Sequence, residues 1–175
     1  MRIIGAAFLF SILIGADVAL AACNDSAAPG VTWRRCLVDG EDMTGVNLAG
    51  ADLRGASFKR ASLAGADLRG SRAGGAKFIS AHLDKAILSD SDLQRADFTN
   101  ASLDGALLER ADLRGSRLYD AKLRGANLTG AQLTGADLLR TDFSGATWTD
   151  GTTICGEGSV GRCLTSGATT LDDGS

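Results

Sequence analysis

The residues able to do acid–base or nucleophilic chemistry gather around the single histidine of the chain. Ser62, His82 and Ser102 lie twenty residues apart, and Asp84 and Asp104 follow at the same spacing. A serine, a histidine and an aspartate within reach of one another are the groups of a hydrolase triad. No neighbouring motif supplies an oxyanion hole or a closed pocket, and any polar-faced repeat brings such residue types together. We therefore assign no catalytic residue and expect no enzyme activity, with a hydrolase as the least favoured alternative.

The four cysteines, Cys23, Cys36, Cys155 and Cys163, favour disulfides over metal binding. They form two local pairs, which flank twelve residues near one end and seven near the other. An even number of cysteines in local pairs suits two disulfides in an oxidising compartment. The CxxC spacing of zinc sites and the G-x-x-x-x-G-K-[ST] phosphate loop are both absent from the sequence. We expect no metal site and no cofactor.

The first 22 residues match a secretory signal peptide. Arg2 provides the positive charge, Ile3–Ile14 the apolar segment, and Ala19–Ala22 the small residues of a cleavage site. This apolar segment of twelve residues is too short for a membrane-spanning helix, which needs about 20. The mature protein is therefore expected in the periplasm or outside the cell. The sequence LAAC, which ends at Cys23, also resembles a bacterial lipobox, so a lipid anchor on Cys23 stays an alternative.

A five-residue repeat runs from Val46 to Asp150 and sets the positions of all these residues. The stretch divides into 21 pentads without an insertion. The large central residue is Leu in 15 pentads and Phe in four, and the residue two before it is Ala in 16. The residue two after the centre is Gly in 11. We number the pentad from its small residue, so that position three is the large apolar centre.

A period of five fits neither a continuous helix nor a continuous strand. On an α-helix, five residues advance about 500°, which scatters the large apolar side chains around the axis. In a strand, an odd period would send alternate leucines to the solvent. The chain must therefore turn once in each pentad. Positions one and three then point inward from a short extended segment, and positions four and five form the corner, where Gly tolerates a positive φ.

Ala51-Asp-Leu-Arg-Gly, Ala66-Asp-Leu-Arg-Gly and Ala111-Asp-Leu-Arg-Gly resemble the A(D/N)LxX unit of pentapeptide-repeat proteins. The resemblance implies an all-β fold, a right-handed quadrilateral β-helix with four pentads in each coil. A weaker pentad phase extends upstream to Val31, which gives about six coils in total. Glu41 occupies a position for a small inward side chain, so we expect the first coil to be distorted there.

Five segments are expected along the chain. They are a signal peptide (1–22), an N-terminal cap with degenerate repeats (23–45), the pentapeptide-repeat β-helix (46–150), a C-terminal cap loop (151–163) and a disordered tail (164–175). Because the open ends of a β stack attract further strands, each end needs a cover. Trp33 with the first cysteine loop, and Trp148 with the second, are placed to provide it.

Four inward positions carry a hydroxyl instead of Ala, namely Ser71, Ser91, Ser116 and Thr141. Buried polar groups are usually hydrogen-bonded. We therefore expect these hydroxyls to donate to backbone carbonyls of adjacent coils.

The surface charge argues against a nucleic-acid partner. The chain has a net charge of −3, and residues 41–150 hold 15 acidic and 14 basic side chains. The family resemblance also implies DNA mimicry as a candidate activity, in which an acidic rod occupies the DNA site of a type II topoisomerase. Such a mimic needs the dense negative charge of a duplex, and an exported protein would not meet that enzyme. This function is kept as an alternative.

The favoured hypothesis is a non-catalytic exported scaffold or protein-binding module that acts through a flat solenoid face. Its partner would be a protein of the cell envelope, with membrane contact only if Cys23 is lipidated. Ile79, Tyr119 and Leu139 recur in one outward column, flanked by Arg117 and Arg140. Exposed apolar, aromatic and Arg side chains in a row are typical of binding surfaces. These last five residues are the predicted binding surface.

Overall fold

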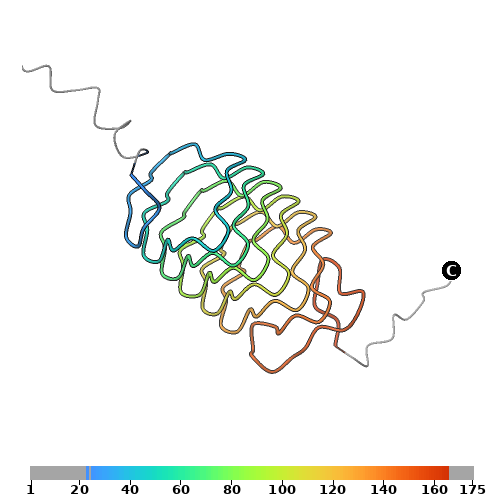
Figure 1. Ribbon diagram of the computed structural model, residues 1–175. Coiled ribbons are helices and arrows are strands. Elements are labelled where there is room, and N and C mark those ends of the chain that lie inside the picture. Colours follow the sequence, from blue (N-terminus) through green and yellow to red (C-terminus); the bar gives the residue numbers. More distant parts are fainter. Residues whose placement is uncertain (1–22, 24, 166–175) are drawn as a thin grey trace, which may run out of the picture.

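The protein is a stack of similar coils that are wound around a common axis, with a different closing segment at each end (Figure 1). The computed structural model describes residue 23 and residues 25–165. The predicted signal peptide and most of the predicted tail lie outside the described residues. The described chain contains no α-helix and no strand of several residues, because each pentad contributes a single bridging residue and then turns. None of its segments is a helix long and apolar enough to cross a membrane.

Parallel pairing between coils defines the architecture. Twenty bridges run from Thr32–Asp52 to Asn127–Thr147, and each joins a residue to the one twenty positions later. The spatial repeat is therefore four pentads long, and every fourth pentad stacks in one column. This confirms a pentapeptide-repeat solenoid. Its right-handed sense and its count of about six coils stay predictions.

The interior is filled by positions one and three of the pentads, as the period predicts. Leu48 and Leu68, one coil apart, are fully buried. Phe58, Phe78 and Phe98 form another column, with ring centroids 5.1 and 4.9 Å apart and ring planes within 7° of parallel. Adjacent coils lie at the spacing of β-strands, about 4.8 Å, so identical side chains at one position stack face to face. Burying each Phe contributes roughly 1.5–3 kcal/mol.

The corners are hydrogen-bonded turns, except the one before Glu41. The N–H of position one donates to the carbonyl of the preceding position three, as Ala51 does to Leu48 at 3.0 Å. Position five adopts a positive φ, for example 68° at Gly50 and 58° at Arg60. A turn with a left-handed third residue favours Gly there, because Gly has no Cβ to clash.

Asp or Asn at position two secures the following corner, which explains the A(D/N)L pattern. Asp67 Oδ1 accepts the backbone N–H of Arg69 at 3.1 Å, and Asn47 Oδ1 accepts that of Ala49 at 3.0 Å. Short Asx side chains reach the backbone two residues ahead and so stabilise turns. Ten residues accept such a bond: Asp42, Asn47, Asp52, Asp67, Asp92, Asp97, Asp112, Asn127, Asp137 and Asp142.

The first coil is more regular than expected. Its pairing begins at Thr32, so regular solenoid already occupies much of the segment 23–45 that was assigned to a cap with degenerate repeats. The Glu41 side chain is exposed, yet its carbonyl accepts the N–H of Ser62 at 2.9 Å. Within the described chain, the Glu41 N–H lacks only the turn bond that other position-one residues make. The distortion is confined to one corner because the ladder holds the backbone on both sides.

The buried hydroxyls follow the prediction at one of four sites. Thr141 Oγ1 donates to the Leu118 carbonyl of the adjacent coil at 2.7 Å. Ser91 Oγ instead donates to a carbonyl of its own coil, three residues back, at 2.5 Å. The buried hydroxyls of Ser71 and Ser116 have no partner among the described residues. The prediction was wrong for the three serines, because a short side chain bonds the nearest turn carbonyl or none.

The N-terminal end is closed by Trp33 and the first cysteine pair. Trp33 is buried, and its Nε1–H donates to the Asp25 carbonyl at 3.1 Å. The Sγ atoms of Cys23 and Cys36 lie 2.00 Å apart. The indole and the disulfide thus tie the preceding chain to the first coil, in the place the sequence predicted.

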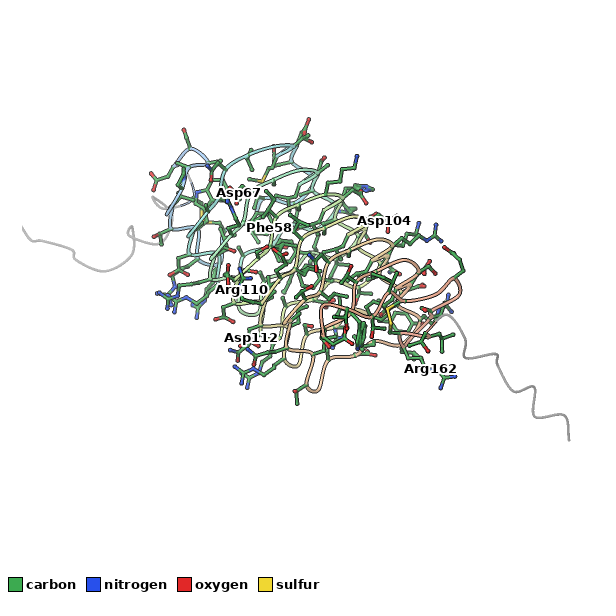
Figure 2. The ribbon with its side chains drawn as sticks, turned by 90° about the horizontal axis from the view of Figure 1, so that it is seen from below. Phe58, Asp67, Asp104, Arg110, Asp112 and Arg162 are labelled. Atoms are coloured by element: carbon green, nitrogen blue, oxygen red, sulfur yellow. A yellow bond between two sulfur atoms is a disulfide. The ribbon has the colours of Figure 1, made fainter. Side chains whose placement is uncertain are left out.

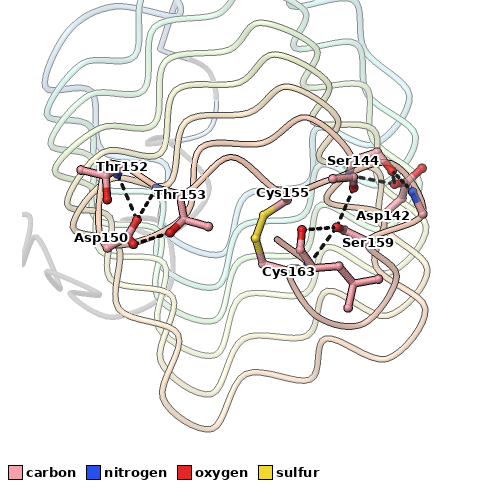
Figure 3. The surroundings of a disulfide bond; sticks show 11 residues. Asp142, Ser144, Asp150, Thr152, Thr153, Cys155, Ser159 and Cys163 are labelled. Carbon is pink, nitrogen blue, oxygen red and sulfur yellow. Dashed lines mark hydrogen bonds between the residues drawn. A yellow bond between two sulfur atoms is a disulfide. The ribbon is translucent and has the colours of Figure 1, made fainter. Parts of the chain in front are cut away.

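The C-terminal end is covered by a segment that folds back over the last coil (Figure 3). Antiparallel bridges join Asp142 to Val160 and Thr147 to Ile154. The Sγ atoms of Cys155 and Cys163 lie 1.99 Å apart. The reversal of direction lets the chain pair with the coil it has just completed.

The C-terminal cap is longer than the predicted range 151–163. Thr165 forms an antiparallel bridge with Cys155, and the Leu164 carbonyl accepts the N–H of Gly156 at 2.6 Å. Leu164 and Thr165, which were expected to start the disordered tail, therefore belong to the cap. The remaining ten tail residues, 166–175, lie outside the described chain.

Candidate functional site

His82 lies beside the two serines of its column, as the spacing predicts, but the group is not arranged as a triad. Parallel bridges join Ser62 to His82 and His82 to Ser102. The Ser102 hydroxyl donates to Asp84 Oδ1, which also accepts the N–H of Asp104. No hydrogen bond links His82 to either serine in the described chain. A serine nucleophile needs a base that takes its proton, and here the carboxylate holds Ser102 as part of a polar face.

The five residues of the predicted binding surface belong to outward positions of the stack. We call Ile79, Arg117, Tyr119, Leu139 and Arg140 the Tyr119 surface. The backbone places Tyr119 and Leu139 at the same position of adjacent coils, so they are neighbours. Leu139 is 62% exposed, whereas Ile79 and Tyr119 are half-buried. The guanidinium carbon of Arg140 lies 5.9 Å from the centroid of the Tyr119 ring, within the range of a cation–π contact.

Carboxylates of the preceding coil hold both arginines of the Tyr119 surface. Arg117 Nη1 lies 2.9 Å from Asp97 Oδ2, and Arg140 Nη2 lies 3.4 Å from Asp120 Oδ2. Such exposed ion pairs contribute little stability, about 0–1 kcal/mol each. They do orient the guanidinium groups along the stack, next to the aromatic ring.

A shallow, open hollow adjoins this surface. It is lined by Arg95, Asp97, Arg117 and Asp137, together with Ser116. Alternating positive and negative side chains and an open shape suit contact with a polar partner surface better than enclosure of a small molecule. The Tyr119 surface and this hollow share Arg117.

Aspartate and arginine pair along the outer faces, which leaves the surface near neutral. Figure 2 shows Asp67, Arg110 and Asp112 on the outside of the stack. Arg69 Nη2 contacts Asp67 Oδ2 at 2.5 Å, and Arg114 Nη2 contacts Asp112 Oδ2 at 2.6 Å. Hydrogen bonds from these arginines hold the pKa of each aspartate below its usual value. Each carboxylate therefore stays ionised but is compensated by an adjacent cation.

Four exposed apolar side chains were missed by the sequence reasoning. Leu37 is 80% exposed, and Leu107, Ile154 and Val160 are also exposed. Leu37 and Leu107 occupy position two, which points outward in every pentad, so the repeat itself carried that signal. Ile154 and Val160 lie on the cap, whose pairing the pentad phase does not encode. Within the described chain, no group of three or more metal-ligating side chains comes together.

Comparison with known proteins places the repeat in a known family. The family model for pentapeptide repeats matches residues 42–78, 74–110, 91–130 and 111–147. No curated protein sequence matches the chain. Among solved structures, 31 chains match.

Three of these structures illustrate the likeness. HetL, a pentapeptide repeat protein involved in heterocyst differentiation regulation from the cyanobacterium Nostoc sp. Strain PCC 7120, is 31% identical over 69% of this chain and 67% of its own, with a TM-score of 0.48. The pentapeptide repeat protein Rfr23 from the cyanobacterium Cyanothece 51142 is 27% identical over 68% of this chain and 88% of its own, with a TM-score of 0.52. QnrB1, a plasmid-mediated fluoroquinolone resistance protein, is 25% identical over 66% and 61%, with a TM-score of 0.41.

The matched residues, the period of five and the coil-to-coil pairing agree with one another. The family match spans the part of the chain in which pentads four apart bridge one another. The chain belongs to the pentapeptide-repeat family.

Proposed function

We propose that this protein is a non-catalytic, exported scaffold that binds a protein partner of the cell envelope through the Tyr119 surface. The scaffold we infer is a right-handed quadrilateral β-helix of about six coils. Regular ladder bonds between coils favour a rigid stack. A surface on a rigid stack loses little conformational freedom on binding, which lowers the entropic cost of association.

The observation that carries this proposal is the contact between Tyr119 and Arg140 beside the exposed Leu139. Aromatic and Arg side chains contribute most to protein interfaces, especially when an apolar neighbour helps to exclude water. The column is flat, so it suits a partner with an extended or flat surface. The non-catalytic part of the proposal is supported by the structural role of the Ser102–Asp84 bond.

Export is supported by the cysteines. Both pairs lie at disulfide distance, and disulfides persist mainly in the periplasm and outside the cell. A Cys23 sulfur bonded to Cys36 is not available for a lipid thioether. The pairing therefore favours a periplasmic or secreted protein over one anchored through Cys23.

A topoisomerase-directed DNA mimic receives less support. A duplex presents one negative charge per ~1.7 Å of its axis, without interruption. Here Asp52 and Asp112 lie on one face, and each is paired with the arginine two residues later at 2.5–2.6 Å. The paired cations break the row of negative charge that such a mimic requires.

In-cell crosslinking, with identification of the captured envelope proteins, tests the proposed function. A Tyr119→Ala, Leu139→Ser double variant is expected to reduce recovery of the main partner on the order of tenfold, because it removes the central aromatic and apolar contacts. An Ile87→Ser, Leu107→Ser double variant is the control, since these residues pair on a different face.

Equal recovery of the partner by the wild-type protein and by the Tyr119→Ala, Leu139→Ser variant would exclude the Tyr119 surface as the interface. Loss in the control variant alone would move the interface to the face that holds Leu107. Hydrolase turnover that disappears in His82→Ala would overturn the non-catalytic reading.

A further inference from the structure

The last coil exposes a backbone edge along residues 131–140 that the cap does not pair with. The cap forms its bridges only to Asp142 and Thr147. In the preceding coils, the N–H groups of positions three and five donate forward to the next coil, as Leu118 does to the Asp137 carbonyl at 2.8 Å. Four such N–H groups have no acceptor among the described residues: Leu133, Gly135, Leu138 and Arg140.

On the two sides of the last coil that the cap covers, the cap pairs with backbone groups of the same type. Where the cap covers the coil, Trp148 N–H donates to the Thr153 carbonyl and Cys155 N–H donates to the Ala146 carbonyl, both at 2.8 Å. Each covered segment thus uses a position-three N–H and a position-one carbonyl. Leu138 N–H and the Ala136 carbonyl offer this pair without a described partner. An open edge of this kind binds any extended segment that reaches it.

Side chains along this edge are also less buried than the equivalent side chains of the preceding coil. Leu118, one coil earlier, is 1% exposed, whereas Leu138 in the same column is only half-buried. Ala136 is half-buried too, and Leu139 beside it is exposed. One further pentad on residues 136–140 would bury these groups as the earlier coils bury theirs.

The residues that follow the cap contain a pentad of the required pattern. Residues 169–173 read Thr-Thr-Leu-Asp-Asp, with Leu171 at the large central position. Thr at the small position has a precedent in Thr141, which is fully buried. Asp at position five has precedents in Asp90 and Asp120, with φ of 59° and 58°. This segment is part of the tail that was predicted to be disordered, but its residue types follow the order of the repeat.

Charge favours the edge at residues 136–140. In the register that stacks Leu171 on Leu138, Asp173 comes next to Arg140, in the same position-five column. Asp90 and Arg110 form such a contact in adjacent coils, at 2.7 Å. The cap passes this edge at Gly161, where a Cβ atom would lie 3.6 Å from the Leu138 carbonyl oxygen.

We propose that residues 169–173 dock on residues 136–140 as one further pentad, parallel to the coil, with Leu171 on Leu138 and Asp173 beside Arg140. The docked segment accepts the Leu138 N–H and covers this edge against a second copy or another strand. The adjacent edge at residues 131–135 stays open. This inference does not depend on the proposed function.

Amide hydrogen exchange of the full disulfide-bonded chain tests the proposal, with Leu133 as an internal control for Leu138. In the full chain the Leu138 N–H is expected to exchange about tenfold more slowly than that of Leu133, because only Leu138 gains an acceptor. A chain that stops after Thr165, and a Leu171→Asp variant, should both raise the Leu138 rate to that of Leu133. Ala168→Ser, which lies outside the pentad, should change neither rate.

Two results would overturn the docking of this segment. The first is a Leu138 exchange rate that is the same in the full and the shortened chain. The second is protection of both amides that rises with protein concentration and survives removal of residues 166–175, which would assign the edge to a second copy of the chain. A Leu171→Asp variant that keeps the protection would contradict the stated register.

Discussion

Two serines of the solenoid interior, Ser71 and Ser116, have buried hydroxyls without a described hydrogen-bond partner. A buried hydroxyl that gains no hydrogen bond costs about 1–3 kcal/mol, because it has lost its contact with water. Ser91 has the same burial but donates to the Leu88 carbonyl. Similar residues in equivalent positions therefore differ in energy through one hydrogen bond.

The first prediction concerns these serines. Ser71→Ala should raise the free energy of unfolding by about 1 kcal/mol, because it removes the unpaired hydroxyl and leaves the backbone unchanged. Ser91→Ala is the matched control and should lower it by about 0.5–1.5 kcal/mol, the usual value of a lost hydrogen bond. Chemical denaturation of both variants gives the comparison. A destabilised Ser71→Ala variant would mean that its hydroxyl does have a partner.

The second prediction concerns Asp150, whose pKa is lowered from 3.8 to about 2. The main cause is the hydrogen bond from the Thr153 hydroxyl, and the backbone N–H groups of Thr153 and Thr152 add to it (Figure 3). A depressed carboxyl pKa adds stability above the unfolded value, and this stability is lost as the pH falls through the folded value. The cap is therefore expected to weaken between about pH 4 and pH 2. Titration of Asp150 by NMR should show its pKa rising toward 3.8 in Thr153→Val. Thr149→Val, the control, should leave the titration unchanged.

At the scale of the pentad, the corner decides which residues the repeat accepts. From Gly50 to Gly145, position five has a positive φ whether it holds Gly or another residue, for instance 67° at Gly75 and 58° at Lys85. A residue with a Cβ is strained in this conformation by about 1–2 kcal/mol. Ten non-Gly residues adopt it, and most of them lie in coils that are paired on both sides, so the ladder bonds there outweigh the local preference.

The third prediction uses two adjacent glycines that differ in φ. Gly75→Ala should lower the free energy of unfolding by about 1 kcal/mol, because its φ is 67° and a Cβ there meets no atom within 4 Å, so the cost is backbone strain alone. Gly74→Ala should be neutral or slightly stabilising, since its φ is not positive and its Cβ would lie at least 3.7 Å from other atoms. Thermal denaturation of the two variants measures the difference. Equal effects would show that the strain at position five is not the reason for its glycines.

At the scale of the whole molecule, the two ends differ from the repeat between them. Coils in the middle have neighbours on both sides, whereas the end coils have one, so stability there must come from other contacts. Each end carries one cysteine pair at disulfide distance. A disulfide in a short loop contributes about 2–4 kcal/mol, largely by restricting the unfolded chain.

The fourth prediction is the covalent state of the protein, which we propose is exported. Its intact mass should correspond to a chain that begins near Ala22 and lacks the four hydrogens of two reduced cysteine pairs. Reduction should lower the free energy of unfolding by about 2–4 kcal/mol for each pair. A diacyl or triacyl mass on Cys23 would establish the lipid-anchored alternative instead, and the full-length mass would argue against cleavage of the signal peptide.

The sequence by itself determined which side chains enter the core and where the chain turns. The period of five places Ala and Leu two residues apart, as at Ala51 and Leu53, and puts Gly at the corner. These are local relations between neighbouring residues, so they can be derived from side-chain direction and from the φ that each residue tolerates. The outward direction of Tyr119 and Leu139 follows from the same relations, but their place in one column also needed the four pentads per coil that the family resemblance implies.

Only the tertiary structure decided how the pentads and the ends fit together. The twenty-residue step that pairs Ser62 with His82 depends on the angle at four successive corners, which no single pentad encodes. The antiparallel return of Val160 onto Asp142, the free edge at Leu138 and the partner of each buried serine depend on which backbone groups earlier pairing leaves available. Hydrogen bonds between segments far apart in sequence are settled only when those segments are packed, because each group has few partners within reach and competes for them with its neighbours.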